Sequence, residues 1–322
     1  MAKKQKAPEQ MSIGEQVAYI QNNLGYQPMI RQPKMWLKTG SKRLNSVLGS
    51  RGFGIPYGKV ILLAGDYSSG KTLLGTKILG LAQADGADPG YIDIENSADP
   101  VFAKRMGGLD FGEEIGPNIW EKVALFQPGV GIFGRTKRQP KAEVRLQTAE
   151  ELFTVAEKWV MLRHRLNPKG KRAFLVDSTT AIVPEEEMVA GLDDQNMRSR
   201  LSPAVFLNTM TKRWAQIALN TNTLVILISQ IRIDPTAMFG NPERIPGGKG
   251  LVFYPSIIAQ LRRANKGGNI TDPAGNVVGL RSTISNLKNK AGAGSVERCK
   301  IGMKAYFKKN EWQFFDAKEV KI

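Results

Sequence analysis

The sequence predicts a doubly wound α/β fold, in which helices cover both faces of a mostly parallel sheet with antiparallel strands at its edge. Short apolar runs recur along the chain, helical patterns lie between them, and a glycine-rich loop joins the first run to a helix. Each run is rich in β-branched or apolar residues and is too short for a helix, as expected of buried parallel strands. The four runs are residues 60–64, 91–94, 173–176 and 223–229. Alternating strands and helices are typical of this fold class.

Three helices between these strands are predicted from apolar spacing and capping signals. The first begins near Lys71, directly after the glycine-rich loop. The second presents one apolar face at helical spacing, made by Leu152, Val155, Ala156, Trp159 and Leu162. The third is expected to have Ser202 as its N-cap and Pro203 as its first residue, because the first turn needs no backbone N–H from proline.

The N-terminal end is predicted to be an arm distinct from the core. Residues 11–24 are expected to form a small amphipathic helix, and residues 25–38, which contain two prolines, have the composition of a linker. We therefore divide the chain into residues 1–36, an arm and linker used in oligomerisation, and residues 37–322, the core.

Two turn-rich segments interrupt the pattern inside the core. Residues 127–143 combine glycine and proline with basic side chains, which favours an exposed loop over a helix or strand. Residues 264–277 have the same turn-rich character and are expected to join two edge strands as a hairpin. The first segment is a basic insertion to which the sequence assigns no role.

Composition limits the chemistry available to the chain. With 322 residues and 42% apolar content, it can bury a substantial core without crosslinks. Cys299 and His164 are the only residues of their types, which excludes an intrachain disulfide and the usual cysteine or histidine metal clusters. Any metal must therefore be held by oxygen ligands. No apolar run reaches the length of a signal peptide or a membrane span, which predicts a cytoplasmic protein with no membrane partner.

The charge is strongly positive, at +17. It is concentrated at both ends, since residues 1–60 hold ten basic and two acidic side chains and residues 281–322 hold ten basic and four acidic. Such an excess favours a polyanionic partner such as nucleic acid, and a merely soluble basic surface is the alternative.

Residues 65–72 match the phosphate-binding pattern GxxxxGK[ST] in the required setting, between a predicted strand and a predicted helix. The loop consists of Gly65, Asp66, Tyr67, Ser68, Ser69, Gly70, Lys71 and Thr72. Its glycines let backbone amides and the helix N-terminus face phosphates, while Lys71 reaches the β and γ phosphates and the Thr72 hydroxyl ligates Mg²⁺. A chance glycine-rich turn is the alternative, and the flanking strand and helix argue against it. The loop therefore predicts ATP and Mg²⁺ as ligands.

Two acidic residues follow predicted strands, at the edge of a parallel sheet where site residues gather. Asp177 ends one run and is the candidate for holding the Mg²⁺ shell. Glu95 ends another and is the candidate for orienting and deprotonating the attacking water. The alternatives are a satisfied strand-end acid for Asp177 and a helix-capping or salt-bridged carboxylate for Glu95.

Four further segments accompany the phosphate loop, and together they resemble the RecA family of DNA recombinases, including its shorter phage relatives of the UvsX type. They are YIDIENSADP at 91–100, LVDS at 175–178, ISQIR at 228–232 and MFGNPE at 238–243. The last is the most specific, since nothing generic requires it. The resemblance covers about residues 37–308 and implies a RecA-type phosphate-loop ATPase core. It also implies that the C-terminal lobe and acidic tail of bacterial relatives are missing, because the chain ends soon after the core.

The resemblance implies roles around the nucleotide. Glu95 would be the catalytic carboxylate, Asp99 and Phe102 would flank the adenine, and Gln230 would sense the γ-phosphate and relay its presence to the loop that follows. Phe102 stands where many relatives have tyrosine.

The resemblance also implies contacts between subunits. Lys288 and Lys290 would reach across a subunit interface and neutralise charge on the neighbour's γ-phosphate. Without the resemblance, they are two solvent-facing lysines at alternate positions of an edge strand. Residues 11–24 and Phe253 are the candidates for filament contacts.

Two segments resemble the family's DNA-binding loops. The second loop, residues 231–248, offers basic groups for phosphates and apolar groups for unpaired bases, namely Arg232, Met238, Phe239, Gly240, Asn241, Arg244, Gly247 and Gly248. The first loop, residues 188–200, matches less well and contributes Arg198 and Arg200, followed by Lys212 and Arg213 on the next helix. Ordinary surface connections are the alternative for both loops.

The resemblance implies an ATP-dependent recombination protein that forms helical filaments on single-stranded DNA and exchanges strands with a homologous duplex, with DNA-stimulated ATP hydrolysis. Loader or single-strand-binding proteins are possible partners. The alternatives are a ring helicase or motor of the same ATPase fold, and a DNA-coating mediator that performs no strand exchange.

Overall fold

A computed structural model describes residues 12, 15, 16, 19, 23, 33–50, 52–133, 143–190, 196–234, 242–264, 268–271, 273–291, 298–306 and 311–316. Contacts divide the chain into two units, Met1–Gln32 and Pro33–Ile322. In the first unit, Ser12 and Glu15 bond reciprocally, with Ser12 N donating to Glu15 Oε2 at 2.7 Å and Glu15 N to Ser12 Oγ at 3.3 Å. This is a helix-starting capping box. Glu15, Gln16, Tyr19 and Asn23 are helical, and the rest of the predicted helix at 11–24 lies outside the described residues.

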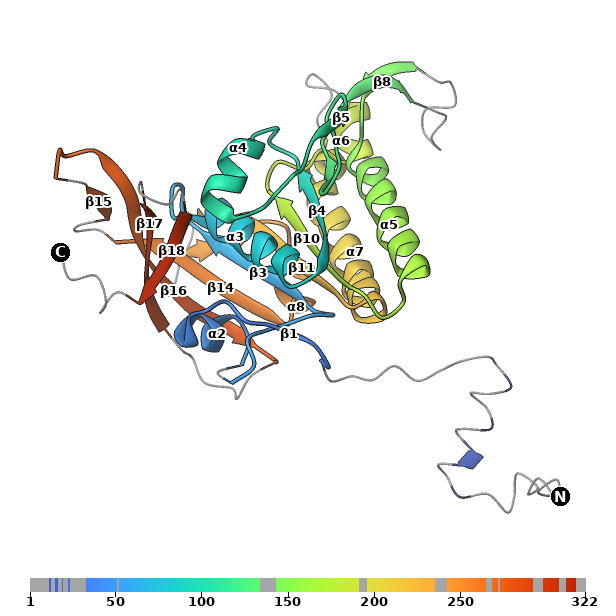
Figure 1. Cartoon of the computed structure of the whole chain (residues 1–322). Coiled ribbons are helices and arrows are strands. Elements are labelled where there is room, and N and C mark those ends of the chain that lie inside the picture. Colours follow the sequence, from blue (N-terminus) through green and yellow to red (C-terminus); the bar gives the residue numbers. More distant parts are fainter. Residues whose placement is uncertain are drawn as a thin grey trace. The chain divides into compact units, whose positions relative to one another are not determined.

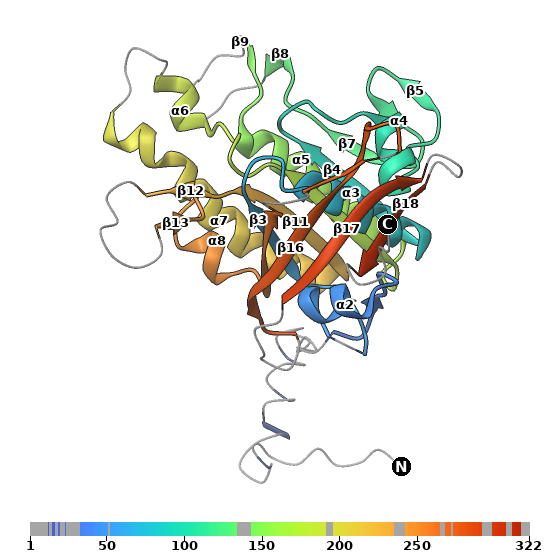
Figure 2. The same cartoon turned by 90° about the vertical axis from the view of Figure 1, so that its left-hand side faces the viewer.

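The second unit is built on a sheet that has ten strands within the described residues (Figure 1). Six strands are parallel, in the order β7 (Ala124–Phe126), β4 (Ala87–Asp93), β10 (Lys171–Asp177), β11 (Thr223–Gln230), β3 (Val60–Gly65) and β14 (Ile257–Arg263). Four antiparallel strands extend it beyond β14, namely β16 (Val277–Asn289), β17 (Arg298–Tyr306), β18 (Glu311–Asp316) and β15 (Asn269–Thr271). Figure 2 shows β16, β17 and β18 side by side. The predicted mixed sheet and its four parallel strands are confirmed.

The parallel strands are apolar throughout because both of their faces are covered, as in a doubly wound fold. In β11, Leu224, Ile226 and Ile228 belong to one core cluster, and Val225 and Leu227 belong to the other. The first cluster includes α2 (Lys42–Leu48) and α3 (Lys71–Ala84), and the second includes α5 (Ala149–Leu166), α7 (Met197–Thr221) and α8 (Gly250–Phe253). No helix in the described part of the chain is long and apolar enough to cross a membrane.

Short elements complete the unit. Four two-stranded pairs are described, β1 (Trp36–Leu37) with β2 (Ile55–Pro56), β5 (Glu114–Gly116) with β6 (Ile119–Trp120), β8 (Val130–Phe133) with β9 (Glu143–Leu146), and β12 (Arg232–Ile233) with β13 (Glu243–Arg244). The short helical segments are α4 (Pro100–Phe102), the π-helix η2 (Ala103–Gly107) and α6 (Glu185–Ala190).

The predicted start of α7 at Ser202 and Pro203 is wrong, because the helix begins at Met197 and contains Pro203. Proline there cannot donate to the carbonyl of Ser199, four residues earlier. The Ser202 hydroxyl donates to that carbonyl instead, at 2.8 Å, so the helix passes through the proline with this acceptor satisfied.

The predicted apolar face of α5 is only partly buried. Leu152 and Ala156 lie in the core, but Val155 and Leu162 are 48% and 43% exposed. The buried positions, which follow the same helical spacing on a rotated face, are Ala149, Leu152, Phe153, Ala156 and Val160.

Two predictions about turn-rich segments need correction. The predicted loop at 127–143 contains β8, which pairs with β9 as a hairpin, while residues 134–142 lie outside the described residues. The segment 264–277 does not join two edge strands, because β14 lies between β3 and β16. The hairpin formed there is β15 with β16.

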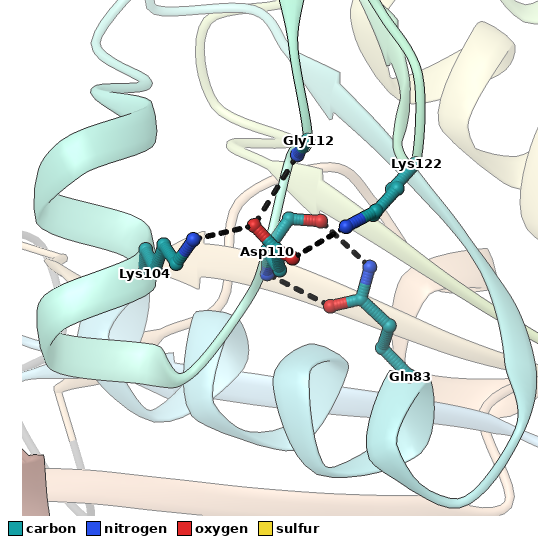
Figure 3. Close-up of polar contacts among 5 residues, drawn as sticks. All are labelled: Gln83, Lys104, Asp110, Gly112 and Lys122. Atoms are coloured by element: carbon teal, nitrogen blue, oxygen red, sulfur yellow. Dashed lines mark hydrogen bonds and ion pairs between the residues drawn. The ribbon is translucent and has the colours of Figure 1, made fainter.

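A polar cluster fastens the segment after η2 to the end of α3 (Figure 3). The Asp110 carboxylate accepts from Lys104 Nζ and Lys122 Nζ, both at 3.0 Å, and from Gly112 N at 3.3 Å. Its backbone exchanges two hydrogen bonds with the Gln83 amide, at 2.7 and 2.8 Å. Hydrogen bonds from Lys104 and then Lys122 lower the pKa of Asp110 to about 2.

The buried guanidinium of Arg172, at the start of β10, joins the ends of two helices. It donates to the carbonyls of Arg163 and Asn167 at the end of α5, to Thr221 at the end of α7, and to Gly170. The last carbonyls of a helix have no partner within it. Arg172 therefore caps α5 and α7 together.

Candidate functional site

The loop that follows β3 wraps tightly before α3 begins. A Cβ atom added to Gly65 would lie 2.4 Å from the backbone oxygen of Leu261 and 2.7 Å from Ser69 Oγ, so only glycine fits. Gly70, the N-cap of α3, has φ +88°, a conformation that favours glycine. The two glycines of the phosphate-loop pattern are therefore required by the backbone path.

Two buried polar side chains of this loop, Ser69 and Lys71, are placed where a phosphate could bind. Ser69 is fully buried, and its Oγ has no hydrogen-bond partner among the described residues. Lys71 is 8% exposed, its Nζ donates to the Asp66 carbonyl at 2.7 Å, and burial lowers its pKa. The Ser282 hydroxyl of β16 donates to the Ser69 carbonyl at 2.8 Å and so fastens the loop to the antiparallel part of the sheet. A buried hydroxyl and a buried ammonium at a helix N-terminus form a site suited to an anion.

The carboxylate of Asp177 lies directly beside the loop, at the carboxyl end of β10. Thr72 Oγ1 donates to Asp177 Oδ2 at 2.6 Å. Burial raises the pKa of Asp177 to about 6, with a smaller contribution from the charges of Glu95 and Asp93. A buried carboxylate whose ionised form is disfavoured by burial binds a cation favourably, because the cation's positive charge offsets the negative charge of the carboxylate.

Glu95 reaches the same place from the turn after β4. Ser178, next to Asp177, donates from its hydroxyl to Glu95 Oε1 at 2.6 Å, and its Oγ lies 2.7 Å from Thr180 Oγ1. The structure thus brings together the two acids and the threonine that the sequence placed on three separate segments.

These groups line a cavity of about 720 Å³. Its wall includes loop residues 67–72 with Glu95, Phe102, Asp177, Ser178 and Gln230. Asp99 is not among the lining residues. Its carboxylate caps α4, accepting from Val101 N at 2.8 Å and Phe102 N at 3.1 Å, and thereby orients the segment that carries Phe102.

A family model described as the RecA N-terminal domain matches residues 23–115 and 167–302. The chain belongs to the RecA family. Protein RecA of Rickettsia africae (strain ESF-5) is similar, with 30% identity over 254 residues, which are 79% of this chain and 62% of that protein. The match thus spans less than two thirds of the relative's length. Residues 116–166, between the two matched parts, include β7, the β8–β9 hairpin and α5.

In this RecA family member, Gln230 ends the strand next to the phosphate-loop strand. Gln230 pairs in register with Gly65, and Ile231 N donates to the Gly65 carbonyl at 3.1 Å. The segment after Gln230 therefore starts from a direct backbone bond to the first residue of the phosphate loop.

The predicted second DNA-binding loop is closed at its base. Arg232 and Arg244 face each other in the β12–β13 ladder, and Arg244 Nε lies 3.8 Å from Asp234 Oδ2. Gly247 and Gly248 have φ values of +105° and +75°. The tip residues Met238, Phe239, Gly240 and Asn241 lie outside the described residues.

The residues of the predicted first DNA-binding loop are spread along α7. Arg198 and Arg200 lie in its first turn, and residues 191–195 lie outside the described residues. Lys212 is exposed farther along the helix. Arg213 Nε is 2.6 Å from Glu157 Oε2 of α5, so this guanidinium is engaged in an ion pair.

Lys288 and Lys290 do not line the cavity. Lys288 Nζ donates to the carbonyls of Val252 and Phe253, at 2.8 and 2.7 Å, and so holds the end of α8 against β16. Burial, and then the charge of Lys290, lower the pKa of Lys288 to about 8. Phe253 is 64% exposed beside this contact.

Sequence reasoning gave no role to Asp93, Gln127 or Ser178. Ser178 contacts Glu95, while Gln127 Nε2 donates to Asp93 Oδ2 at 2.8 Å, close to the turn that carries Glu95. The sequence contained one signal for Asp93, which is an acidic residue at the end of a predicted strand and lies two residues before Glu95.

Proposed function

We propose that this chain binds ATP with Mg²⁺ at the 65–72 loop and hydrolyses it. The observation that carries this proposal is the 2.6 Å contact between Thr72 Oγ1 and Asp177 Oδ2 within a cavity that also holds Lys71 and Glu95. The Ser69 hydroxyl, which has no hydrogen-bond partner in the described part of the chain, fits a phosphate. One carboxylate and one hydroxyl fit Mg²⁺, which takes its remaining ligands from phosphates and water.

In the proposed reaction, Lys71 and the loop amides would hold the β and γ phosphates, and Thr72 and Asp177 would hold the metal. Mg²⁺ would neutralise phosphate charge that develops during transfer. Glu95 orients the attacking water and takes its proton, and the Ser178 hydroxyl fixes the carboxylate at 2.6 Å. Phe102 and Asp99 would form the adenine end of the site.

We further propose that ATP binding controls a filament on single-stranded DNA that exchanges strands with a homologous duplex. Family membership supports a recombinase-type function, and the net charge of +17 supports a polyanionic partner. Gln230 would report the γ-phosphate to loop 231–248. The Ile231 to Gly65 backbone bond at 3.1 Å supports this coupling, because it joins the two loops directly. Lys288, Lys290, Phe253 and residues 11–24 are the proposed contacts between subunits.

The test is ATP hydrolysis at low salt, with and without single-stranded DNA, for wild type, Glu95→Gln and Glu113→Gln. Wild type should be stimulated by DNA, and Glu95→Gln should lose about 100-fold or more in kcat while still binding nucleotide. Glu113→Gln, an exposed residue outside the cavity, should match wild type. Turnover that ignores DNA would refute the filament mechanism, and an active Glu95→Gln would refute the assignment of the base.

Electron microscopy and a strand-exchange assay separate the alternatives. Helical filaments on single-stranded DNA that exchange strands support the proposal. Closed rings would indicate a helicase or motor, and filaments without exchange would indicate a coating mediator.

A further inference from the structure

Asp93, a fully buried carboxylate at the end of β4, lies outside the nucleotide cavity. It accepts from Ala98 N and Gln127 Nε2, both at 2.8 Å, and from Ser97 N at 3.1 Å. Burying an ionised carboxylate is costly unless its oxygens are hydrogen-bonded. These donors compensate the charge, and two of them are backbone groups of the turn that carries Glu95.

The turn from Ile94 to Ala98 depends on these bonds for its shape. Asn96 has φ +52°, a left-handed conformation that asparagine adopts more readily than most non-glycine residues, and it marks the tight bend of the turn. Ile94 N donates to the Asp177 carbonyl at 2.7 Å, which fixes the start of the turn, and Asp93 fixes its end at Ser97 and Ala98. Glu95 is thereby held where its carboxylate meets the Ser178 hydroxyl.

Gln127 brings a third element to this turn. It directly follows the edge strand β7 and lies in the stretch 116–166 that the family model leaves unmatched. The β8–β9 hairpin starts a few residues later, and its base is closed by a bond from Gln147 N to Gly129 O at 2.9 Å. The amide of Gln127 is the contact from this stretch to Asp93.

We propose that Asp93 and Gln127 are positioning residues for Glu95. Gln127 orients Asp93, Asp93 holds the turn 94–98, and the turn fixes the carboxylate that acts on water. This inference rests on the proposed ATP hydrolysis at Glu95. It predicts a defect in turnover and not in nucleotide binding, because the phosphate loop is held by separate contacts, the pairing of Gly65 with Leu261 of β14 and the bond from Ser282 of β16.

The test compares Gln127→Met, which keeps the side-chain length and removes the donor, with Gln147→Ala, which changes a side chain at the base of the same hairpin. Gln127→Met should lower kcat by about 10-fold or more, because small misplacements of a reacting group have effects of this order. Its KM for ATP should stay at the wild-type value, while its melting temperature should fall, because the buried Asp93 carboxylate loses one donor. Gln147→Ala should match wild type in all three.

Asp93→Asn supplies a second variant and a double-mutant cycle. If the two residues act in series, Asp93→Asn combined with Gln127→Met should lose no more kcat than the more impaired single variant. Two outcomes would overturn this inference and leave the proposed function standing, provided that wild type hydrolyses ATP. One is an unchanged kcat in Gln127→Met, and the other is additive losses of kcat in the double variant. A wild type that does not hydrolyse ATP would overturn the proposed function and this inference with it.

Discussion

Replacing Asp177 with asparagine is expected to stabilise the protein at neutral and alkaline pH. The carboxylate is 2% exposed, and burial raises its pKa from 3.8 to about 6. The folded state therefore prefers the protonated form more strongly than the unfolded chain does. Asparagine has the same shape, carries no charge and can still accept the hydrogen bond from Thr72.

The size of the gain follows from the pKa shift. Each pKa unit is worth about 1.4 kcal/mol, so a shift of roughly two units corresponds to about 3 kcal/mol above pH 6. Asp177→Asn raises the free energy of unfolding, because an acid with a raised pKa destabilises the fold when it is ionised. The gain in Asp177→Asn should fall to about half by pH 5 and to about a fifth by pH 4, and it should vanish below about pH 3, where both states of wild type are protonated.

Urea unfolding of wild type and Asp177→Asn between about pH 4 and pH 8 tests this reasoning. Glu113→Gln controls for the loss of one exposed acid and should show no comparable gain. An Asp177→Asn protein that is less stable than wild type at pH 8, or a difference that does not change with pH, would refute it.

Three other outcomes are expected. Apparent Mg²⁺ affinity, measured with a fluorescent ATP analogue, should fall about tenfold between pH 7 and pH 5, because a proton on Asp177 competes with the cation. The nucleotide phosphates titrate in wild type and in Asp177→Asn alike. Asp177→Asn should therefore lack only the part of the pH dependence that comes from Asp177. Asp110→Asn should lower the free energy of unfolding at pH 7 by less than about 1 kcal/mol, since the ion pairs are partly exposed, and urea titrations should show the difference disappearing as the pH falls from about 4 toward 2. Arg172→Met should lower the free energy of unfolding by about 3 kcal/mol in urea, because helix-end carbonyls of α5 and α7 lose their donor, and a variant as stable as wild type would contradict the capping role.

The sheet and the phosphate loop were predictable because their signals are local. Apolar runs too short for helices specify buried strands, and the loop pattern with its flanking strand and helix specifies one backbone path. The meeting of Thr72 with Asp177 followed from a rule about sheets, since Asp177 ends β10 and Thr72 opens the helix after β3, both at the carboxyl edge of the parallel strands.

Features that depend on tertiary contacts were missed. Pro203 is typical of a helix start, but α7 continues through it, and the Ser202 hydroxyl satisfies the Ser199 carbonyl that the proline leaves without a donor. The turn-rich composition of 127–143 concealed the pairing of β8 with β9. Gln127 and Asp93 lie 34 positions apart, so their contact depends on the fold and not on a local pattern.

The order of strands in the sheet has a consequence for synthesis. β3 is an early strand of the chain, yet its two neighbours, β11 and β14, begin only at Thr223 and Ile257. At ordinary translation rates, the roughly 160 residues that separate β3 from β11 take about 8 to 30 s to make. During that interval the ribosome carries an apolar strand whose hydrogen-bonding partners do not yet exist. The nucleotide loop attached to β3 thus becomes a formed site only after β11 and β14 have been made, and a nascent chain arrested before β11 exposes an apolar segment for chaperones to cover.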